Sequence, residues 1–255
     1  MLNELKYKLH SYANPEKAKL LQRFFKTGKG EYGEGDIFIG VKVPDTRKVV
    51  NEFWNKINLE EIQELLNSKI HEERLCGILI LVKKYSKEKN TEDKEKIFHF
   101  YLKNFNRINN WDLVDLSAPN IVGDFVFSNP KFKERIYEFA NSENLWKKRI
   151  AILSTFKFIR ENDTENKKFS VPSKSKNQND LAGFDDSLKL AKHFLDDKHD
   201  LIHKAVGWML REIGKRNEKI LEEFLKKNFK KMPRTMLRYA IEKFEEGKRK
   251  EFLKK

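Results

Sequence analysis

Apolar residues recur every three to four positions along most of the chain, which is the spacing of one face of an α-helix. The pattern predicts short amphipathic helices over 2–13, from Pro15, over 44–57, over 59–67 and over 71–85. Asn14 directly precedes Pro15, and this pair is typical of a helix N-cap followed by proline in the first turn. No stretch alternates apolar and polar residues as a half-buried strand does, so we expect an all-α protein.

The most apolar of the expected helices form a repeat. Five segments that are apolar on more than one stripe begin at residues 71, 110, 144, 199 and 233, each after a more polar helix. Their starts are spaced by 39, 34, 55 and 34 residues, and the long spacing falls to 35 when an insert of 20 residues at 164–183 is set aside. Two helices in each repeat of this length are the signature of an α-solenoid of HEAT-like repeats. The sequence therefore predicts a single domain over 1–255, a curved superhelix with a concave face.

Two segments interrupt the helical pattern. Residues 164–183 are poor in apolar side chains and rich in Lys, Ser and Asn, so we expect an inserted flexible loop. This loop is either a tolerated surface insertion or a basic flap that touches DNA phosphates. Residues 28–36 are rich in glycine but match neither phosphate-binding loop pattern. Tyr32, Asp36 and Lys42 remain candidates for the edge of a binding surface.

Composition narrows the classes of protein and partner. The 255 residues include 53 basic and 39 acidic side chains, a net charge of +14. This excess indicates a polyanionic partner, most simply nucleic acid, or else a lysine-rich solvated surface. The 20 Phe exclude a disordered chain, and no run of about 20 apolar residues is present to cross a membrane. The single Cys76 and a polar N-terminus without a signal-peptide pattern lead us to expect a soluble, cytoplasmic protein.

Conventional catalytic patterns are not evident in the sequence. Six histidines are scattered, and although His199 and His203 could share a helix face, the pattern of a zinc protease is missing. No nucleophilic-serine motif is present either. We therefore expect neither a metal ion nor an organic cofactor.

One placement stands out among the repeats. Trp111 and Asp115 are four residues apart, so they lie on one face of a helix, one turn from each other. A carboxylate beside an aromatic ring is uncommon on a helix with an apolar pattern. In the alternative interpretation, Asp115 caps or pairs locally, Trp111 belongs to the core and Asp112 alone is exposed.

The next two repeats carry related residues at the same position. One has Trp146 followed by Arg149, and the other has Trp208 between Lys204 and Arg211. Indoles mixed with basic groups suit a phosphate backbone with its sugars and bases.

These three segments together resemble a known family. WDLVD at 111–115, LWKKRIAIL at 145–153 and KAVGWMLRE at 204–212 are similar to the AlkD-type alkylpurine DNA glycosylases, the DNA alkylation repair family built from HEAT-like repeats. The resemblance runs over nearly the whole chain, from NPEKA at 14–18 to the last repeat. It implies that Asp115 is the catalytic carboxylate, that Trp111 and Trp208 face the lesion and that Arg149 holds a phosphate. Lys157 and Arg211 match basic positions near the DNA backbone, and Lys148 and Lys42 are added as candidates for the same role.

The resemblance also implies a reaction, the hydrolytic removal of N3- or N7-alkylated purines from double-stranded DNA by a monomer. Such a base already carries a positive charge and leaves readily, so the group that needs stabilising is the oxocarbenium-like sugar. The Asp115 carboxylate would stabilise that sugar and position the attacking water. Trp111 and Trp208 would pack on the sugar and on the cationic base. The resemblance further implies cleavage without base flipping.

Other functions stay open at this point. HEAT-like solenoids bind more often than they catalyse, so the alternative is a non-catalytic module for a DNA structure or a protein partner. An RNA-binding repeat protein is a third possibility, although the recognition pairs of one-base-per-repeat proteins are not evident. The sequence also departs from the family, because Phe24 stands where a tyrosine is expected and the glycine-rich turn is longer.

Overall fold

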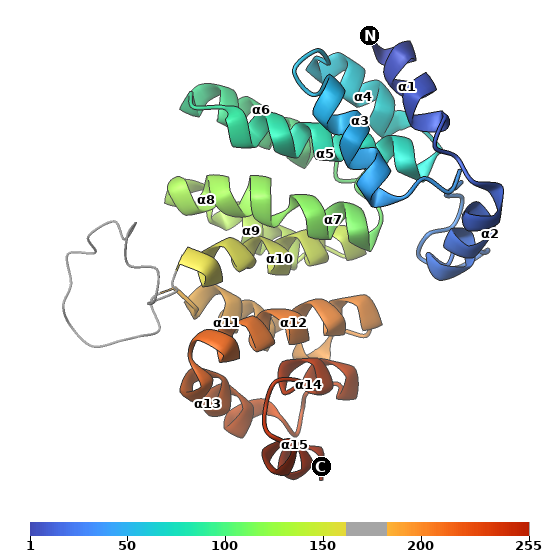
Figure 1. Ribbon diagram of the computed structural model, residues 1–255. Coiled ribbons are helices and arrows are strands. Elements are labelled where there is room, and N and C mark those ends of the chain that lie inside the picture. Colours follow the sequence, from blue (N-terminus) through green and yellow to red (C-terminus); the bar gives the residue numbers. More distant parts are fainter. Residues whose placement is uncertain (162–182, 255) are drawn as a thin grey trace. The chain divides into compact units, whose positions relative to one another are not determined.

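The computed structural model describes residues 1–161 and 183–254, and the regular elements in this part of the chain are helices (Figure 1). They form two compact units, Met1–Ile121 and Val122–Lys255, called the N-terminal unit and the C-terminal unit below. The prediction of an all-α protein built as a solenoid of repeated helices is confirmed. The predicted loop at 164–183 lies outside the described residues except for its last residue. Among the described helices, none is long and apolar enough to cross a membrane.

The N-terminal unit is organised around one buried helix. Its elements are α1 (Leu2–His10), α2 (Pro15–Phe24), α3 (Val43–Phe53), α4 (Leu59–Asn67), α5 (His71–Lys87), α6 (Thr91–Lys103) and α7 (Trp111–Ser117). α5 packs against α3, α4 and α7, so its side chains are buried on several sides. This packing explains why its sequence is apolar on more than one stripe.

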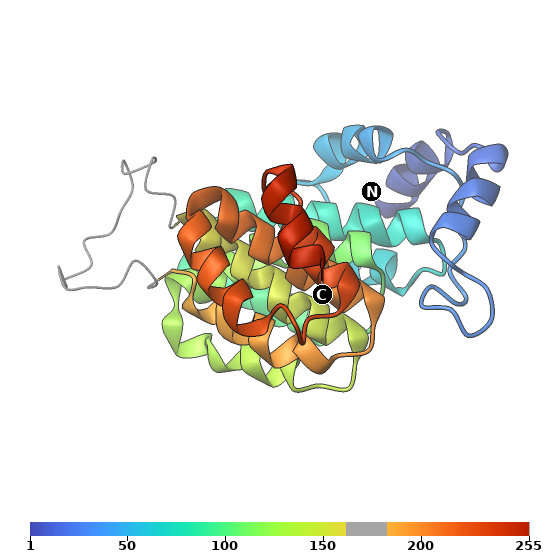
Figure 2. The ribbon, with the colours of Figure 1, turned by 90° about the horizontal axis from the view of Figure 1, so that it is seen from below.

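α2 differs from the other helices of the N-terminal unit. It begins as predicted, with the Asn14 side chain accepting the Lys17 N–H at 2.9 Å and Pro15 in the first turn. None of its residues is fully buried. Figure 2 shows α2 and the loop that follows it at the edge of the unit. The helix therefore has an apolar face that the core covers only in part.

The C-terminal unit repeats the same plan with two buried helices. Its elements are α8 (Asp124–Ser128), η2 (Pro130–Phe132), α9 (Glu134–Ala140), α10 (Leu145–Glu161), α11 (Asp185–His193), η4 (Phe194–Asp196), α12 (Asp200–Arg216), α13 (Glu218–Asn228), α14 (Arg234–Ala240) and α15 (Glu246–Leu253). α12 packs against α10, α13 and α14. Gly207 allows α12 and α14 to approach closely, since a Cβ there would lie 2.6 Å from the Met236 carbonyl oxygen.

The apolar segment from residue 110 is not one continuous helix. α7 ends at Ser117, a π-helical turn follows over Pro119–Gly123, and α8 begins at Asp124. Pro119 lacks an N–H and cannot continue the α-helical hydrogen bonding. Gly123 lies so close to α10 that a Cβ would be 2.3 Å from the Ser154 carbonyl oxygen. The hydrophobic pattern predicted the segment but could not reveal this break.

Candidate active site

The start of α7 is fixed by a buried asparagine. The Asn110 side chain is fully buried and accepts the N–H of Trp111 at 2.8 Å. Its amide nitrogen donates to Asp36 at 3.3 Å. Because the helix begins at residue 111, Trp111 and Asp115 lie one turn apart on it, as the sequence predicted.

The Trp111 indole lies in an aromatic cluster with α2 and the residue after it. It stacks on Phe25 with ring centroids 5.0 Å apart and an angle of 5° between the rings. Phe24 meets it edge-on at 5.9 Å and is 62% exposed. The position where the family suggests a tyrosine therefore does contact the indole, but through a ring without a hydroxyl. Trp111 itself is half-buried, so part of its surface is accessible.

Asp115 is half-buried one turn further along α7. It lies near the phenol of Tyr101, which is fully buried and bonded to the Ser117 hydroxyl at 2.9 Å. Burial raises the pKa of Tyr101, and the Asp115 carboxylate contributes to the rise. The carboxylate thus sits at the border between the core and the surface.

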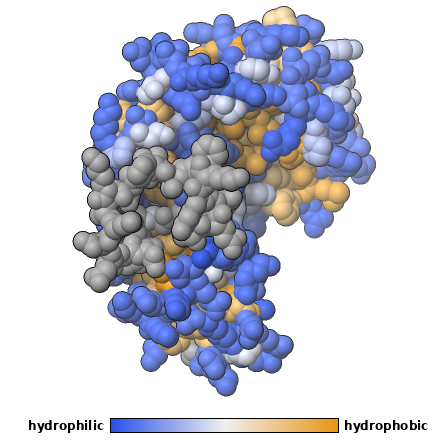
Figure 3. Space-filling model, turned by 60° about the vertical axis from the view of Figure 1, so that its left-hand side comes forward, coloured by the Kyte–Doolittle hydropathy of each residue, from blue (hydrophilic) through white to orange (hydrophobic). Residues whose placement is uncertain are grey.

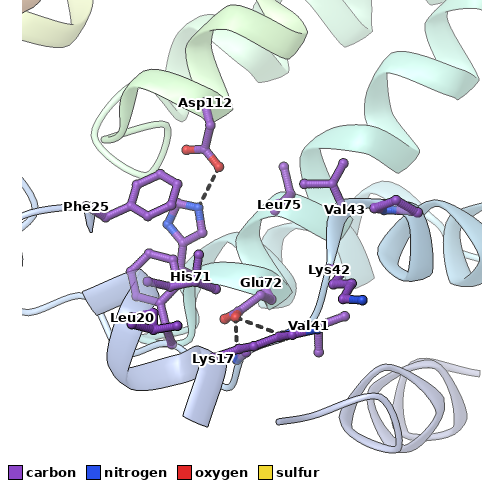
Figure 4. Close-up of a pocket in the computed structure, with 14 residues that line it drawn as sticks. Lys17, Leu20, Phe25, Val41, Lys42, Val43, His71, Glu72, Leu75 and Asp112 are labelled. Atoms are coloured by element: carbon purple, nitrogen blue, oxygen red, sulfur yellow. Dashed lines mark hydrogen bonds and ion pairs between the residues drawn. The ribbon is translucent and has the colours of Figure 1, made fainter. Parts of the chain in front are cut away.

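Asp112, by contrast, is buried and belongs to a charged network that the sequence analysis did not find. Its Oδ2 lies 2.8 Å from Nε2 of His71 (Figure 4), and its Oδ1 accepts the Leu113 N–H at 2.9 Å. On the other side of the imidazole, Nδ1 lies 3.3 Å from Asp36, whose second oxygen lies 2.7 Å from Arg74. The interpretation that Asp112 alone is exposed is wrong, because only 9% of it is accessible.

The network contains two acids and two bases in the core of the N-terminal unit. Burial lowers the pKa of His71, but the Asp112 and Asp36 carboxylates outweigh it and raise that pKa to about 9. Burial raises the pKa of Asp36, but His71 and Arg74 outweigh it and bring that pKa below its ordinary value. Asp36 is only 6% exposed, so it does not lie at the edge of a binding surface as expected. One signal was available in the sequence, the charged run at 71–74 that opens an otherwise apolar helix.

The other predicted site residues, except Tyr32 and Lys42, belong to the C-terminal unit. Arg149 on α10 is 4% exposed, and its guanidinium donates to the Leu201 carbonyl in the first turn of α12. The phosphate contact expected of Arg149 stays a prediction. Trp208 on α12 is half-buried, with its ring 5.5 Å from that of Phe156.

The predicted basic residues of the C-terminal unit are held by acids. Lys148 lies 2.9 Å from Asp197, and Lys157 lies 2.9 Å from Asp124 and 2.7 Å from Glu161. Arg211 pairs with Glu242. Much of the face shown in Figure 3 is hydrophilic, in keeping with the many charged side chains. Their role in DNA binding stays a prediction, and any phosphate would compete with these carboxylates.

Comparisons with known proteins identify the family. The model of the DNA alkylation repair enzyme family matches residues 5–244. The chain belongs to this family. Membership supports a role in the repair of alkylated DNA and makes DNA the expected substrate.

A solved structure agrees with the fold of this family member. It is described as a predicted DNA alkylation repair enzyme from Enterococcus faecalis. The two chains superpose with a TM-score of 0.64 at 17% identity, over 92% of this chain and 97% of the other. At that identity the likeness shows the fold alone. A search of curated proteins found no match.

Proposed function

We propose that this DNA alkylation repair protein is a DNA glycosylase that removes cationic N3- or N7-alkylated purines from duplex DNA. The observation that supports it most is the arrangement on α7, where the half-buried Asp115 carboxylate follows the half-buried Trp111 indole by one turn. A carboxylate stabilises the positive charge that develops on the sugar, and an indole face favours a cationic base.

Only a few side chains take part in the proposed reaction. The N-glycosidic bond breaks, its electron pair neutralises the alkylated base, and the sugar carries the positive charge until water adds to it. Asp115 stabilises that charge and accepts a proton from the water. Trp111, supported from behind by Phe25, packs on the sugar. The lesion stays in the duplex during this step, and no cofactor takes part.

We further propose supporting roles in the C-terminal unit. Trp208 supplies a second aromatic surface for the lesion, and Lys148, Lys157 and Arg211 exchange their carboxylate partners for DNA phosphates. Arg149 acts through α12, because its buried guanidinium holds the first turn of the helix that carries Trp208. Its direct phosphate contact remains a prediction.

The test is an excision assay on duplex DNA that contains 7-methylguanine. Asp115→Asn keeps the shape of the side chain, so duplex binding should persist while the excision rate falls about 100-fold or more. Asp93→Asn is the matched control, because Asp93 is a half-buried acid in the first turn of α6 that pairs with Lys96. Wild-type excision by the Asp115 variant would refute the mechanism. Duplex binding without excision by the wild-type protein would favour the non-catalytic DNA-binding module.

A further inference from the structure

The N-terminal unit contains a pocket that the proposed reaction does not use. It has a volume of about 430 Å³ and lies between α2, the segment that leads into α3, and the first turns of α5. This volume is within the range of small-molecule sites. Its walls are mainly apolar and include Leu20, Leu21, Phe25, Phe38, Val41 and Leu75 (Figure 4).

Apolar side chains remain exposed at this pocket. Leu20 on α2 is 64% exposed, and Val43 at the start of α3 is 40% exposed. α2 has no fully buried residue, so the helix lines the pocket without filling it. An apolar ligand of matching size would cover surface that the fold leaves open to water.

The floor of the pocket is held in shape by a buried acid. The Glu72 carboxylate accepts the backbone N–H groups of Ile39, Gly40 and Val41 at 2.8 to 3.2 Å. Gly40 has φ of +83°, which an L-residue rarely adopts, and a Cβ there would lie 2.1 Å from the Asn14 carbonyl oxygen. Residues 39–41 are therefore held in one backbone conformation between α2 and α5. The cavity that they border is preformed.

Two lysines lie together at one part of the lining. Lys17 comes from α2, and Lys42 is the N-cap residue of α3. The two ammonium groups are close enough that Lys42 lowers the pKa of Lys17. Asp45 lies near them but is itself bonded to Lys48 at 2.7 Å. Holding like charges together is unfavourable unless an anion joins them, and the N-terminus of α3 adds partial positive charge.

The other end of the pocket has the opposite character. Lys17 and Phe25 are separated by eight residues along α2 and its C-cap, roughly 12 Å at the helical rise. Phe25 contacts His71 at 5.1 Å between ring centroids, and His71 holds Asp112. Figure 4 shows Asp112 and His71 away from the two lysines. The lining thus runs from cations, through apolar and aromatic walls, to a carboxylate that can accept hydrogen bonds.

We infer that this pocket binds one nucleotide unit, with the phosphate between Lys17 and Lys42, the base against the apolar walls and an amino edge of the base toward Asp112. A nucleotide has this sequence of groups, an anion followed by a planar apolar body and hydrogen-bond donors at the far edge. The occupant that we favour is an unpaired nucleotide turned out of DNA near the lesion, because DNA is the expected substrate of the family. A free nucleoside monophosphate offers the same chemistry. The inference rests on DNA binding and is independent of excision at Asp115.

The experiment compares two duplexes in binding titrations followed by fluorescence anisotropy. One is fully paired and the other carries a single unpaired adenine. The wild-type protein should bind the bulged duplex about tenfold more tightly, since protein–base contacts of this kind are worth that much or more. Leu21→Trp fills the pocket, and Lys17→Gln with Lys42→Gln removes the phosphate contacts. Both variants should bind the two duplexes equally.

The controls separate a specific pocket from general charge. Lys19→Gln with Lys29→Gln removes the same two charges from exposed positions of the same region and should keep the preference. Titration with free dAMP forms a second arm. Binding of dAMP that the pocket variants abolish, without any preference for the bulge, would support the pocket and assign it to free nucleotides.

Two results would overturn the inference. One is equal binding of both duplexes by the wild-type protein together with no binding of dAMP. The other is a bulge preference that survives in both pocket variants. Circular dichroism melting of each variant shows whether it is folded, and a misfolded Leu21→Trp leaves the lysine variant to decide. The excision rate of Asp115→Asn is measured separately, so failure of the pocket and failure of the glycosylase proposal are distinguishable.

Discussion

The buried imidazole of His71 makes the stability of the protein depend on pH in a predictable way. His71 lies between the carboxylates of Asp112 and Asp36, with Arg74 on the far side of Asp36. Its pKa rises from 6.5 to about 9 on folding. Because the folded value is the higher one, protonated His71 stabilises the native state fully below pH 6.5, and that contribution is lost as the pH rises through 9. The difference in pKa corresponds to about 3 kcal/mol.

The assay measures the free energy of unfolding by urea for the wild type and for His71→Gln at intervals from pH 6 to pH 9.5. Glutamine keeps a hydrogen-bonding side chain but cannot carry a charge. The advantage of the wild type over the variant should shrink by about 3 kcal/mol across this range. The pKa of Asp36 is lowered, so Asp36 does not titrate in this window and the change reports on His71.

A matched control keeps the interpretation clear. His99 is an exposed histidine on α6, so His99→Gln shows what removal of an imidazole outside the network does to the free energy of unfolding in the same assay. An advantage over His71→Gln that stays constant from pH 6 to pH 9.5 would refute the idea that His71 is protonated between the two acids. An advantage that grows with pH would mean that the buried imidazole is neutral.

Three further substitutions test the packing. Gly40→Ala should lower the free energy of unfolding by more than about 2 kcal/mol, because of its positive φ and the contact with the Asn14 carbonyl; a near-neutral thermal melt would contradict this. Glu72→Gln replaces charge-assisted bonds to three backbone N–H groups, so a loss of about 2 kcal/mol is expected by urea unfolding. Arg149→Met should destabilise the C-terminal unit by about 2 kcal/mol, because it removes the bond to the Leu201 carbonyl, and an unchanged salt dependence of DNA binding would rule out the predicted phosphate contact. A salt slope reduced by about one in that variant would support the phosphate contact.

Local signals in the sequence were sufficient to locate the start of α2 and the repeat of buried helices. Asn14 and Pro15 fix the start of α2 through contacts within one turn, so the pattern alone located it. The same holds for the repeat, because each buried helix is apolar on more than one face wherever it packs. The break after Ser117 was not predictable in this way. It depends on the close approach of Gly123 to α10, and residue spacing along one segment carries no information about a neighbouring helix.

The charged residues show the same difference between what local sequence determines and what tertiary packing determines. Asp112 and Asp115 are three residues apart on one short helix, yet the first is buried against His71 and the second reaches the border of the core. The partner of Asp112 is 41 residues away in the sequence, so only tertiary packing selects it. Arg149 was expected to hold a phosphate, and the sequence did not reveal that it donates to the Leu201 carbonyl, 52 residues further along. In both cases the residue type indicated the chemistry of the side chain. It could not indicate which neighbour that side chain contacts.

The start of α7 connects these observations. Trp111 and Asp115 owe their positions to the Asn110 cap, to the salt bridge of Asp112 and to the Phe25 ring beneath the indole. Phe25 also lines the pocket, so the pocket and the Trp111 indole share this ring. A substitution that leaves the indole and the carboxylate intact can therefore still change excision if it moves Phe25 or breaks the network. Effects on catalysis from within the pocket would then be explained by displacement of this ring, without any direct contact between the pocket and the lesion.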